Sequence, residues 1–264
     1  MRSETPEITQ FLALDDVHIE YCYLRGARDG FPTFVLLHEG LGSASQWRDF
    51  PEQLRDRTGC SVVVYSRQGY GKSSSVELPR PLDFLSQHGV QELGRVIDTL
   101  SLSSVVLLGH SDGGSIALAY AAINDPRVLG TIALAPHVLV EKRTLEGIRA
   151  STLHWQRGTF RDRLIQHHGA NVDGAFYGWS NSWLHPQFTL AKITCCLANI
   201  KTPLLVLQGR EDQYAPLEQL NVIQQLVVAS CQCVALDHCQ HFPHREATEQ
   251  TLHLISNFIT DMSA

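Results

Sequence analysis

The sequence predicts an α/β fold, in which a mostly parallel central sheet of about eight strands carries helices on both faces. Short apolar runs, typical of buried strands, alternate along the chain with segments that have helical spacing. No internal repeat, low-complexity tract or linker interrupts this alternation. With 264 residues, the chain is long enough for one domain with a substantial core.

The predicted strands are apolar or alternating segments, at Val17–Leu24, Thr33–Leu37, Ser61–Tyr65, Val105–Leu108, Val128–Leu134, Pro203–Gln208 and Cys231–Leu236. Helical patterns lie between and after them, over Ala44–Arg57, Pro81–Leu100, Asp112–Ile123, Leu217–Val228 and Glu246–Ile259. Repeated strand–helix–strand units imply parallel neighbours, because each helix returns the chain to the same end of the sheet.

One long segment breaks the alternation. Residues 137–200 are too many for a simple connection, and they are rich in aromatic side chains. We expect them to form a helical cap over the carboxyl edge of the sheet, where open parallel sheets bind their ligands. The cap is then an insertion into an α/β core made of residues 1–136 and 201–264.

Composition argues against several classes of function. The net charge of −6 comes without long runs of one sign, which disfavours binding to nucleic acid or to an anionic membrane. No segment has the length of a membrane span and no signal peptide is evident, so we expect a cytoplasmic protein, with a homo-oligomer left open. The seven cysteines have neither disulfide-framework nor zinc-knuckle spacing and are expected to be buried free thiols.

The segment Gly109-His110-Ser111-Asp112-Gly113 joins a predicted strand to a predicted helix and matches the G-x-S-x-G nucleophile elbow. Glycines are needed there because side chains would collide with the turn or with neighbouring strands. A serine at the tip lies at a helix N-terminus, where the dipole and the N–H groups favour developing negative charge. The alternative is a glycine-rich turn without chemistry.

With four other segments, this elbow makes the chain resemble the α/β-hydrolase superfamily of serine hydrolases over nearly its whole length. The segments are LLHEGLGS at 36–43, SRQGYGKSS at 66–74, GHSDGGS at 109–115, GRED at 209–212 and the histidine-rich run at 238–244. The resemblance implies a catalytic triad, with Ser111 as nucleophile, Asp212 as acid and His241 as base. It implies no cofactor.

Other residues compete for the acid and the base. Glu211 adjoins Asp212, but the fourth position of the family's G-x-x-D pattern favours Asp212. Some relatives take the acid from the end of the preceding strand, where this chain has no carboxylate before Glu141. His238 is close enough to the last predicted strand to rival His241 as the base.

The histidines at 238, 241 and 244 also recur at a spacing that could hold a metal ion. Neither the glutamate of a zinc-protease helix nor further ligands accompany them. We therefore predict no metal site.

Two backbone N–H groups are expected to stabilise the oxyanion of the reaction. One belongs to Asp112, which follows the nucleophile, and the other to Gly40, with Leu41 as the second choice. Relatives commonly have glycine where this chain has Glu39, whose carboxylate would repel the oxyanion unless it points away, pairs or stays protonated. We predict that Glu39 forms hydrogen bonds within the loop, with contact to a polar or cationic substrate group as the alternative.

The SRQGYGKSS segment resembles the family's structural G-x-G-x-S turn, but its usual leading Asp is absent. We expect Arg67 to replace that residue's hydrogen bonds with different ones and to have no chemical role.

The sequence is less informative about the substrate, which we expect to be a small molecule. Aromatic residues in 137–200 predict an apolar pocket, although each could instead pack the segment onto the sheet. An ester is the default, cleaved by a carboxylesterase-like enzyme; a thioesterase, a C–C bond hydrolase, a cofactor-free oxygenase and a non-catalytic binding protein are the alternatives. Candidate substrate-binding residues are His38, Glu39, His137, Trp155, Trp179 and Trp183.

Overall fold

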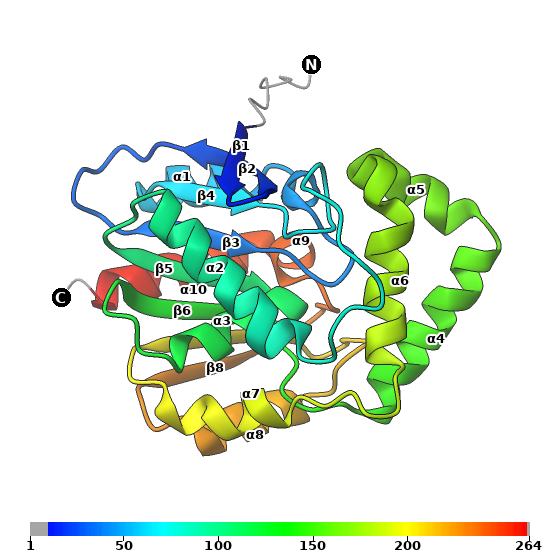
Figure 1. The fold of residues 1–264 in the computed structure, drawn as a ribbon. Coiled ribbons are helices and arrows are strands. Elements are labelled where there is room, and N and C mark those ends of the chain that lie inside the picture. The colour runs from blue at the N-terminus through cyan, green and yellow to red at the C-terminus, as the bar shows by residue number, and fades with distance from the viewer. Residues whose placement is uncertain (1–9, 263–264) are drawn as a thin grey trace.

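The sheet at the centre of the molecule has eight strands in the order β1-β2-β4-β3-β5-β6-β7-β8 (Figure 1). The computed structural model describes residues 10–262. β2 pairs antiparallel with β1 and with β4, and all other neighbours are parallel, so the predicted fold class is confirmed. The strands are β1 (Gln10–Leu14), β2 (Val17–Leu24), β3 (Thr33–Leu37), β4 (Val62–Tyr65), β5 (Val105–His110), β6 (Val128–Leu134), β7 (Leu204–Gly209) and β8 (Cys231–Leu236).

β1 is the strand that the sequence pattern did not predict. It is short, and only Leu12 and Leu14 of its apolar residues turn toward the core, while Phe11 is exposed. A tight turn through Asp15, which has a positive φ of 53°, returns the chain directly into β2. Its place at the edge of the sheet depends on this hairpin pairing rather than on a strong apolar signal.

The helices differ from the predicted ones mainly where a predicted helix is interrupted. Ala44–Arg57 becomes a short 3₁₀ helix at Ala44–Trp47 and a separate α1, because Pro51 favours a helix start. Pro81–Leu100 becomes a π-helical turn at Phe84–His88 followed by α2. The helices are α1 (Phe50–Thr58), α2 (Gly89–Thr99), α3 (Asp112–Ala121), α4 (Lys142–Gln156), α5 (Thr159–His168), α6 (Val172–Trp183), α7 (Ala191–Cys196), α8 (Glu218–Leu226), α9 (Pro243–Glu246) and α10 (Thr248–Met262).

Helices cover both faces of the sheet, because successive side chains of each strand point to opposite sides. In β3, Val35 and Leu37 join the core formed with α2, α3 and α8, whereas Phe34 and Leu36 join the core formed with α1 and α10. Figure 1 shows the two layers on either side of the sheet. Burial on both faces explains why the central strands are almost entirely apolar.

Helices α4, α5 and α6 stand together beyond one end of the sheet (Figure 1). The strands β3, β5, β6 and β7 all run toward this end, so the loops that leave their carboxyl ends face the three helices. The chain then returns along the sheet through α7, whose Ile193 is buried in the same core as α3. The division of the chain into a core and a cap stays a prediction.

Two further features of residues 10–262 are the character of their helices and the state of their cysteines. None of the helices within residues 10–262 has the length and apolar character that crossing a membrane requires. No disulfide forms in this part of the chain. Cys60 and Cys239 are buried as expected, but Cys195 is exposed and the other four cysteines are only partly buried, so the expectation of buried thiols is wrong for these five.

At this end of the sheet, the backbone passes closely against neighbouring backbone where β5 turns into α3. A Cβ atom on Gly109 would lie 2.1 Å from the carbonyl oxygen of Gly113, and one on Gly113 would lie 2.1 Å from that of Leu37. Both neighbours are backbone atoms, which cannot rotate away. Glycine is therefore required at both positions.

We expect Gly113→Ala to lower the free energy of unfolding by about 3 kcal/mol or more, because the added methyl group displaces backbone. Gly174→Ala, in α6, is the matched control, since no atom lies within 4 Å of its Cβ position; it should be neutral or stabilise by up to about 1 kcal/mol. Urea unfolding of both variants checks this. Equal stabilities would contradict the tight crossing.

Candidate active site

Ser111 occupies the turn between β5 and α3 in a strained backbone conformation, with φ 52° and ψ −117°. Such conformations persist only where the surroundings enforce them. Here the N–H of Ser111 donates to the carbonyl of Leu134 at 2.8 Å, at the end of β6, and the glycines described above leave no room for relaxation. The turn presents the Ser111 side chain to a pocket beneath α4–α6.

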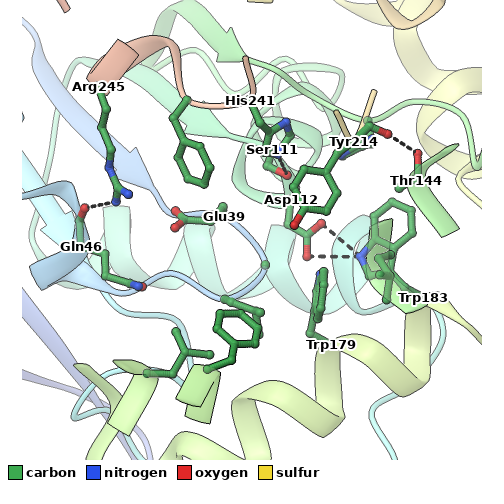
Figure 2. Close-up of a pocket in the computed structure, with 17 residues that line it drawn as sticks. Glu39, Gln46, Ser111, Asp112, Thr144, Trp179, Trp183, Tyr214, His241 and Arg245 are labelled. Carbon is green, nitrogen blue, oxygen red and sulfur yellow. Dashed lines mark hydrogen bonds between the residues drawn. The ribbon is translucent and has the colours of Figure 1, made fainter. Parts of the chain in front are cut away.

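Three polar side chains from different strand ends meet at this point. The imidazole Nε2 of His241 lies 3.0 Å from Ser111 Oγ, and its Nδ1 lies 2.8 Å from Asp212 Oδ2. Because the carboxylate can only accept, Nδ1–H donates to Asp212 and leaves Nε2 to accept the Ser111 hydroxyl proton. Figure 2 shows His241 directly beside Ser111. The structure thus brings together the three residues predicted for the triad.

Asp212 is held in place by the loop after β7. Its Oδ1 accepts the backbone N–H groups of Tyr214 at 2.8 Å and Ala215 at 3.0 Å. Burial alone would raise the pKa of Asp212, but the hydrogen bonds from His241 and from these N–H groups outweigh it and hold the pKa below its usual value. Asp212 therefore stays ionised and fixes both the tautomer and the orientation of His241.

The rival residues lie elsewhere. The His238 side chain is 95% exposed and lies 3.8 Å from Glu211, which is itself exposed. His244 is buried, and its ring contacts those of Trp47 and His110. Within residues 10–262, no group of three or more His, Cys, Asp or Glu side chains is arranged to hold a metal ion.

The loop after β3 is fixed by hydrogen bonds to its carbonyl groups. The Arg67 guanidinium donates to the carbonyl oxygens of His38 and Glu39, at 2.8 and 3.0 Å, and His38 Nδ1 donates to the carbonyl of Glu39 at 2.7 Å. With these carbonyls turned away, the N–H groups of Gly40 and Leu41, which line the pocket, donate to no acceptor among the described residues.

The N–H of Asp112, the third predicted oxyanion donor, is also without an acceptor in the described part of the chain. It begins α3 immediately after Ser111 and belongs to the pocket lining. Two loops that line the pocket together with Ser111 therefore carry N–H groups without an acceptor among the described residues, which are the kind of donors that an anion-stabilising site uses.

Glu39 lines the pocket, and its carboxylate lies near His110 and Arg245. Its Oε2 lies 3.4 Å from His110 Nδ1, and the Arg245 guanidinium faces it across the pocket (Figure 2). Burial would raise the pKa of Glu39, but His110 and Arg245 outweigh burial and lower it well below its usual value. His110 in turn donates from Nε2 to the carbonyl of His241 at 2.7 Å, a contact that the sequence did not suggest.

The Asp112 carboxylate is in a different situation. It is 1% exposed, and Trp183 Nε1 is its hydrogen-bond donor, 3.2 Å from Oδ1 and 3.5 Å from Oδ2 (Figure 2). No Lys, Arg or His nitrogen of residues 10–262 lies within 4.0 Å of it. Burial raises the pKa of Asp112 to about 6, although Arg67 and the Trp183 hydrogen bond oppose the rise. The sequence pattern pointed to the N–H of Asp112 and not to its side chain.

The pocket contains about 780 Å³ of empty space, part of it open to solvent. Of the predicted substrate-binding residues, Glu39, His137, Trp179 and Trp183 line it. His38 and Trp155 do not: His38 is fully buried in the loop contacts above, and Trp155 stacks on Phe176 within α4–α6, with ring centroids 3.9 Å apart. The lining residues that sequence reasoning missed are Gln46, Thr144, Ile148, Phe160, Leu164, Tyr214, Phe242 and Arg245.

We expect Asp112→Asn to stabilise the protein by on the order of 2–3 kcal/mol at neutral pH, because it removes a buried charge while keeping an acceptor for Trp183. A carboxyl group whose pKa rises from 3.8 to about 6 on folding favours the folded state below pH 3.8 and loses that contribution as the pH rises through about 6. The gain from Asp112→Asn should therefore vanish as the pH falls from about 7 to about 4.

Thermal unfolding of both proteins across this pH range checks the expectation. Asp125→Asn is a control in which the effect should have the opposite sign. The Arg127 guanidinium lowers the pKa of Asp125, so removing the Asp125 charge should destabilise the protein at neutral pH. A gain from Asp112→Asn that does not change with pH would show that charge is not its cause.

Comparison with known proteins agrees with this architecture. The model of the alpha/beta hydrolase family matches residues 34–254. A proline iminopeptidase of Lactobacillus delbrueckii subsp. lactis is 30% identical over 115 residues, which are 44% of this chain and 39% of that protein. A bifunctional esterase/perhydrolase of Acinetobacter calcoaceticus is 25% identical over 73% of this chain and 78% of its own length.

Among solved structures, that of VinJ superposes with a TM-score of 0.74, at 21% identity over 97% of this chain and 99% of that one. This likeness concerns the fold. The family match spans most of the chain and includes every strand of the parallel part of the sheet. The chain therefore belongs to the alpha/beta hydrolase family.

Proposed function

We propose that the protein is a serine hydrolase that cleaves small or medium esters through an acyl-enzyme on Ser111. The observation that carries this proposal is the continuous hydrogen-bonded chain from Ser111 Oγ through His241 to Asp212, with distances of 3.0 and 2.8 Å. A nucleophile, a base and an orienting acid within hydrogen-bond reach are what acyl transfer at a hydroxyl group requires.

In the first half of the reaction, Ser111 Oγ attacks the ester carbonyl as its proton passes to His241 Nε2. The resulting imidazolium is stabilised by the ionised Asp212, which does not itself take the proton. The charge that develops on the carbonyl oxygen is stabilised by the N–H groups of Asp112 and Gly40, or of Leu41. His241 then protonates the leaving alcohol as the tetrahedral intermediate collapses to the acyl-enzyme.

In the second half, a water molecule takes the place of the alcohol. His241 accepts a proton from it as the water attacks the acyl-enzyme carbonyl, and the same N–H groups stabilise the second oxyanion. Collapse releases the acid and returns the proton to Ser111. All the groups that this cycle needs belong to the chain itself.

Helices α4–α6 act in this proposal as a cap that limits the size of the substrate. They contribute Thr144, Ile148, Phe160, Leu164, Trp179 and Trp183 to the pocket, most of them apolar or aromatic. Such a lining suits a hydrophobic acyl or alcohol group of modest size. A peptidase, a C–C bond hydrolase or a binding protein would retain the same fold, so substrate choice has to be tested directly.

A panel of chromogenic esters with acyl chains of graded length tests the proposed function. We expect the wild type to hydrolyse the shorter esters, and Ser111→Ala to lower kcat by about four to six orders of magnitude with the fold intact. Asp212→Asn should lower kcat about 10⁴-fold, because the amide favours the wrong tautomer of His241. Hydrolysis that survives Ser111→Ala would exclude Ser111 as the nucleophile.

Gly40→Ala tests the oxyanion loop separately. A Cβ atom at residue 40 would lie 2.2 Å from Trp179 Nε1 and 3.0 Å from Asp112 Oδ2, so either the loop with its N–H groups or the Trp179 indole that lines the pocket must shift. We expect kcat/KM to fall about 100-fold, as for other displacements of about 1 Å in reacting groups. Steady-state kinetics of Gly40→Ala check this, with Gly174→Ala as the control. If both variants keep the wild-type kcat/KM, the oxyanion donors lie elsewhere.

A further inference from the structure

The carboxylates that surround Ser111 differ in whether the protein neutralises them. Asp212 pairs with His241, and the Arg245 guanidinium faces Glu39, whose Oε2 also lies 3.4 Å from His110 Nδ1. For Asp112, no cationic side chain of the described residues comes within 4.0 Å. The N-terminus of α3 lends it partial positive charge, yet its pKa is still raised by burial.

Asp112 also has unused hydrogen-bonding capacity. An ionised carboxylate offers about four acceptor positions, whereas Asp112 receives one indole N–H shared between its two oxygens. A second buried polar side chain lines the same pocket: His137 is 3% exposed, its Nδ1 has no hydrogen-bond partner within residues 10–262, and its ring lies 5.3 Å from that of Trp183. Burial and the neighbouring His241 lower the pKa of His137 to about 3, so it is neutral.

The carboxylate lies beside the loop that carries the expected oxyanion donors, since its Oδ2 would be 3.0 Å from a Cβ atom on Gly40. With an uncharged substrate, the oxyanion would therefore develop close to the negative charge of the Asp112 carboxylate in a poorly solvated space. The repulsion between these two charges opposes the reaction. A cation on the substrate would remove this opposition and would complete the hydrogen bonds of Asp112.

We propose that Asp112 binds a protonated amine of the substrate next to the scissile carbonyl, so that the pocket selects small esters that carry an ammonium group. The inference rests on the proposed hydrolysis at Ser111 and specifies its substrate class. The neutral imidazole of His137, which lines the same pocket, has one acceptor nitrogen for the ammonium, and the indole rings of Trp179 and Trp183 suit a cation on an otherwise apolar wall.

If Asp112 instead has only a structural role, holding α6 through its hydrogen bond with Trp183, then loss of that hydrogen bond and not loss of the charge should matter. Asp112→Asn keeps an acceptor for the indole and removes the charge. Trp183→Phe removes the indole donor and keeps the charge. The two variants therefore separate charge recognition from anchoring, and thermal unfolding confirms that both are folded.

The probes are two pairs of esters that differ in the amine alone. Phenylalanine methyl ester and methyl hydrocinnamate place the difference on the acyl side of the scissile bond. Dimethylaminoethyl acetate and isoamyl acetate place it on the alcohol side, with a carbon atom replacing the nitrogen. The ratio of kcat/KM within each pair is measured for the wild type, Asp112→Asn and Trp183→Phe.

We expect the wild type to prefer the amine in one of the two pairs. Asp112→Asn should reduce that preference on the order of 10- to 100-fold, as loss of a buried charge-assisted hydrogen bond does. Trp183→Phe should keep it. The proposal is overturned if the wild type shows no preference in either pair, if Asp112→Asn retains the preference, or if Trp183→Phe loses it as fully as Asp112→Asn does.

A failure of the proposed function is recognised separately, because no ester would then be hydrolysed at all. In that case binding of the two amine probes to Ser111→Ala and to Ser111→Ala/Asp112→Asn is measured by calorimetry. Binding that weakens on the order of 10- to 100-fold with Asp112→Asn supports the ammonium site without catalysis. Equal affinities, or no binding of either amine to Ser111→Ala, overturn it.

Discussion

The crossing of β5 into α3 determines where Ser111 and the N–H of Asp112 lie, and the rest of the candidate site is arranged around them. Side chains at residues 109 and 113 would meet backbone oxygen at 2.1 Å, so the helix can begin only if the chain turns sharply at Ser111, which adopts a φ of 52°. This turn directs the serine away from the sheet and leaves the N–H of Asp112 without a partner in the described chain. The same close approach brings α3 against the end of β3, and hence beside the loop at Gly40.

The hydrogen-bond donors and charged groups around each acidic side chain of the pocket decide whether its pKa is raised or lowered. Asp212 accepts backbone N–H groups and an imidazole, and its pKa is lowered. Glu39 has His110 and Arg245 nearby, and its pKa is lowered as well. Asp112 has an indole donor, and its pKa is raised. Residue type alone therefore does not decide whether a buried carboxylate is structural or available to a ligand; its partners do.

Much of the fold could be predicted from the sequence because it depends on local apolar periodicity. The predicted strands from Val17 onward fall within a residue or two of those in the structure, and the elbow was identified from its glycines. β1 was missed because only two of its apolar residues face the core, so its alternation is too short to identify. The predicted helix at 44–57 was interrupted by a residue with positive φ and a proline, Arg48 and Pro51, whereas the one at 81–100 was interrupted by a π-helical turn.

The residues of the site whose positions depend on the order of the strands could be predicted. Those whose positions depend on the orientation of a helix could not. Ser111, Asp212 and His241 follow strands whose carboxyl ends share one edge, so their meeting could be expected. Which tryptophans of 137–200 face the pocket depends on how α4–α6 pack: Trp179 and Trp183 line it, whereas Trp155 stacks on Phe176. The role of Arg67 likewise depends on a loop conformation that its sequence position does not specify.

The central claim is that Ser111 is an activated nucleophile, and covalent labelling tests it most directly. A fluorophosphonate reacts with a serine whose hydroxyl is deprotonated by a neighbouring base and whose oxyanion donors can hold the phosphoryl oxygen. The folded protein is labelled at neutral pH and digested, and the modified peptide is sequenced by mass spectrometry. We expect one adduct per chain, on Ser111. An unlabelled folded protein, or an adduct on another side chain, would contradict it.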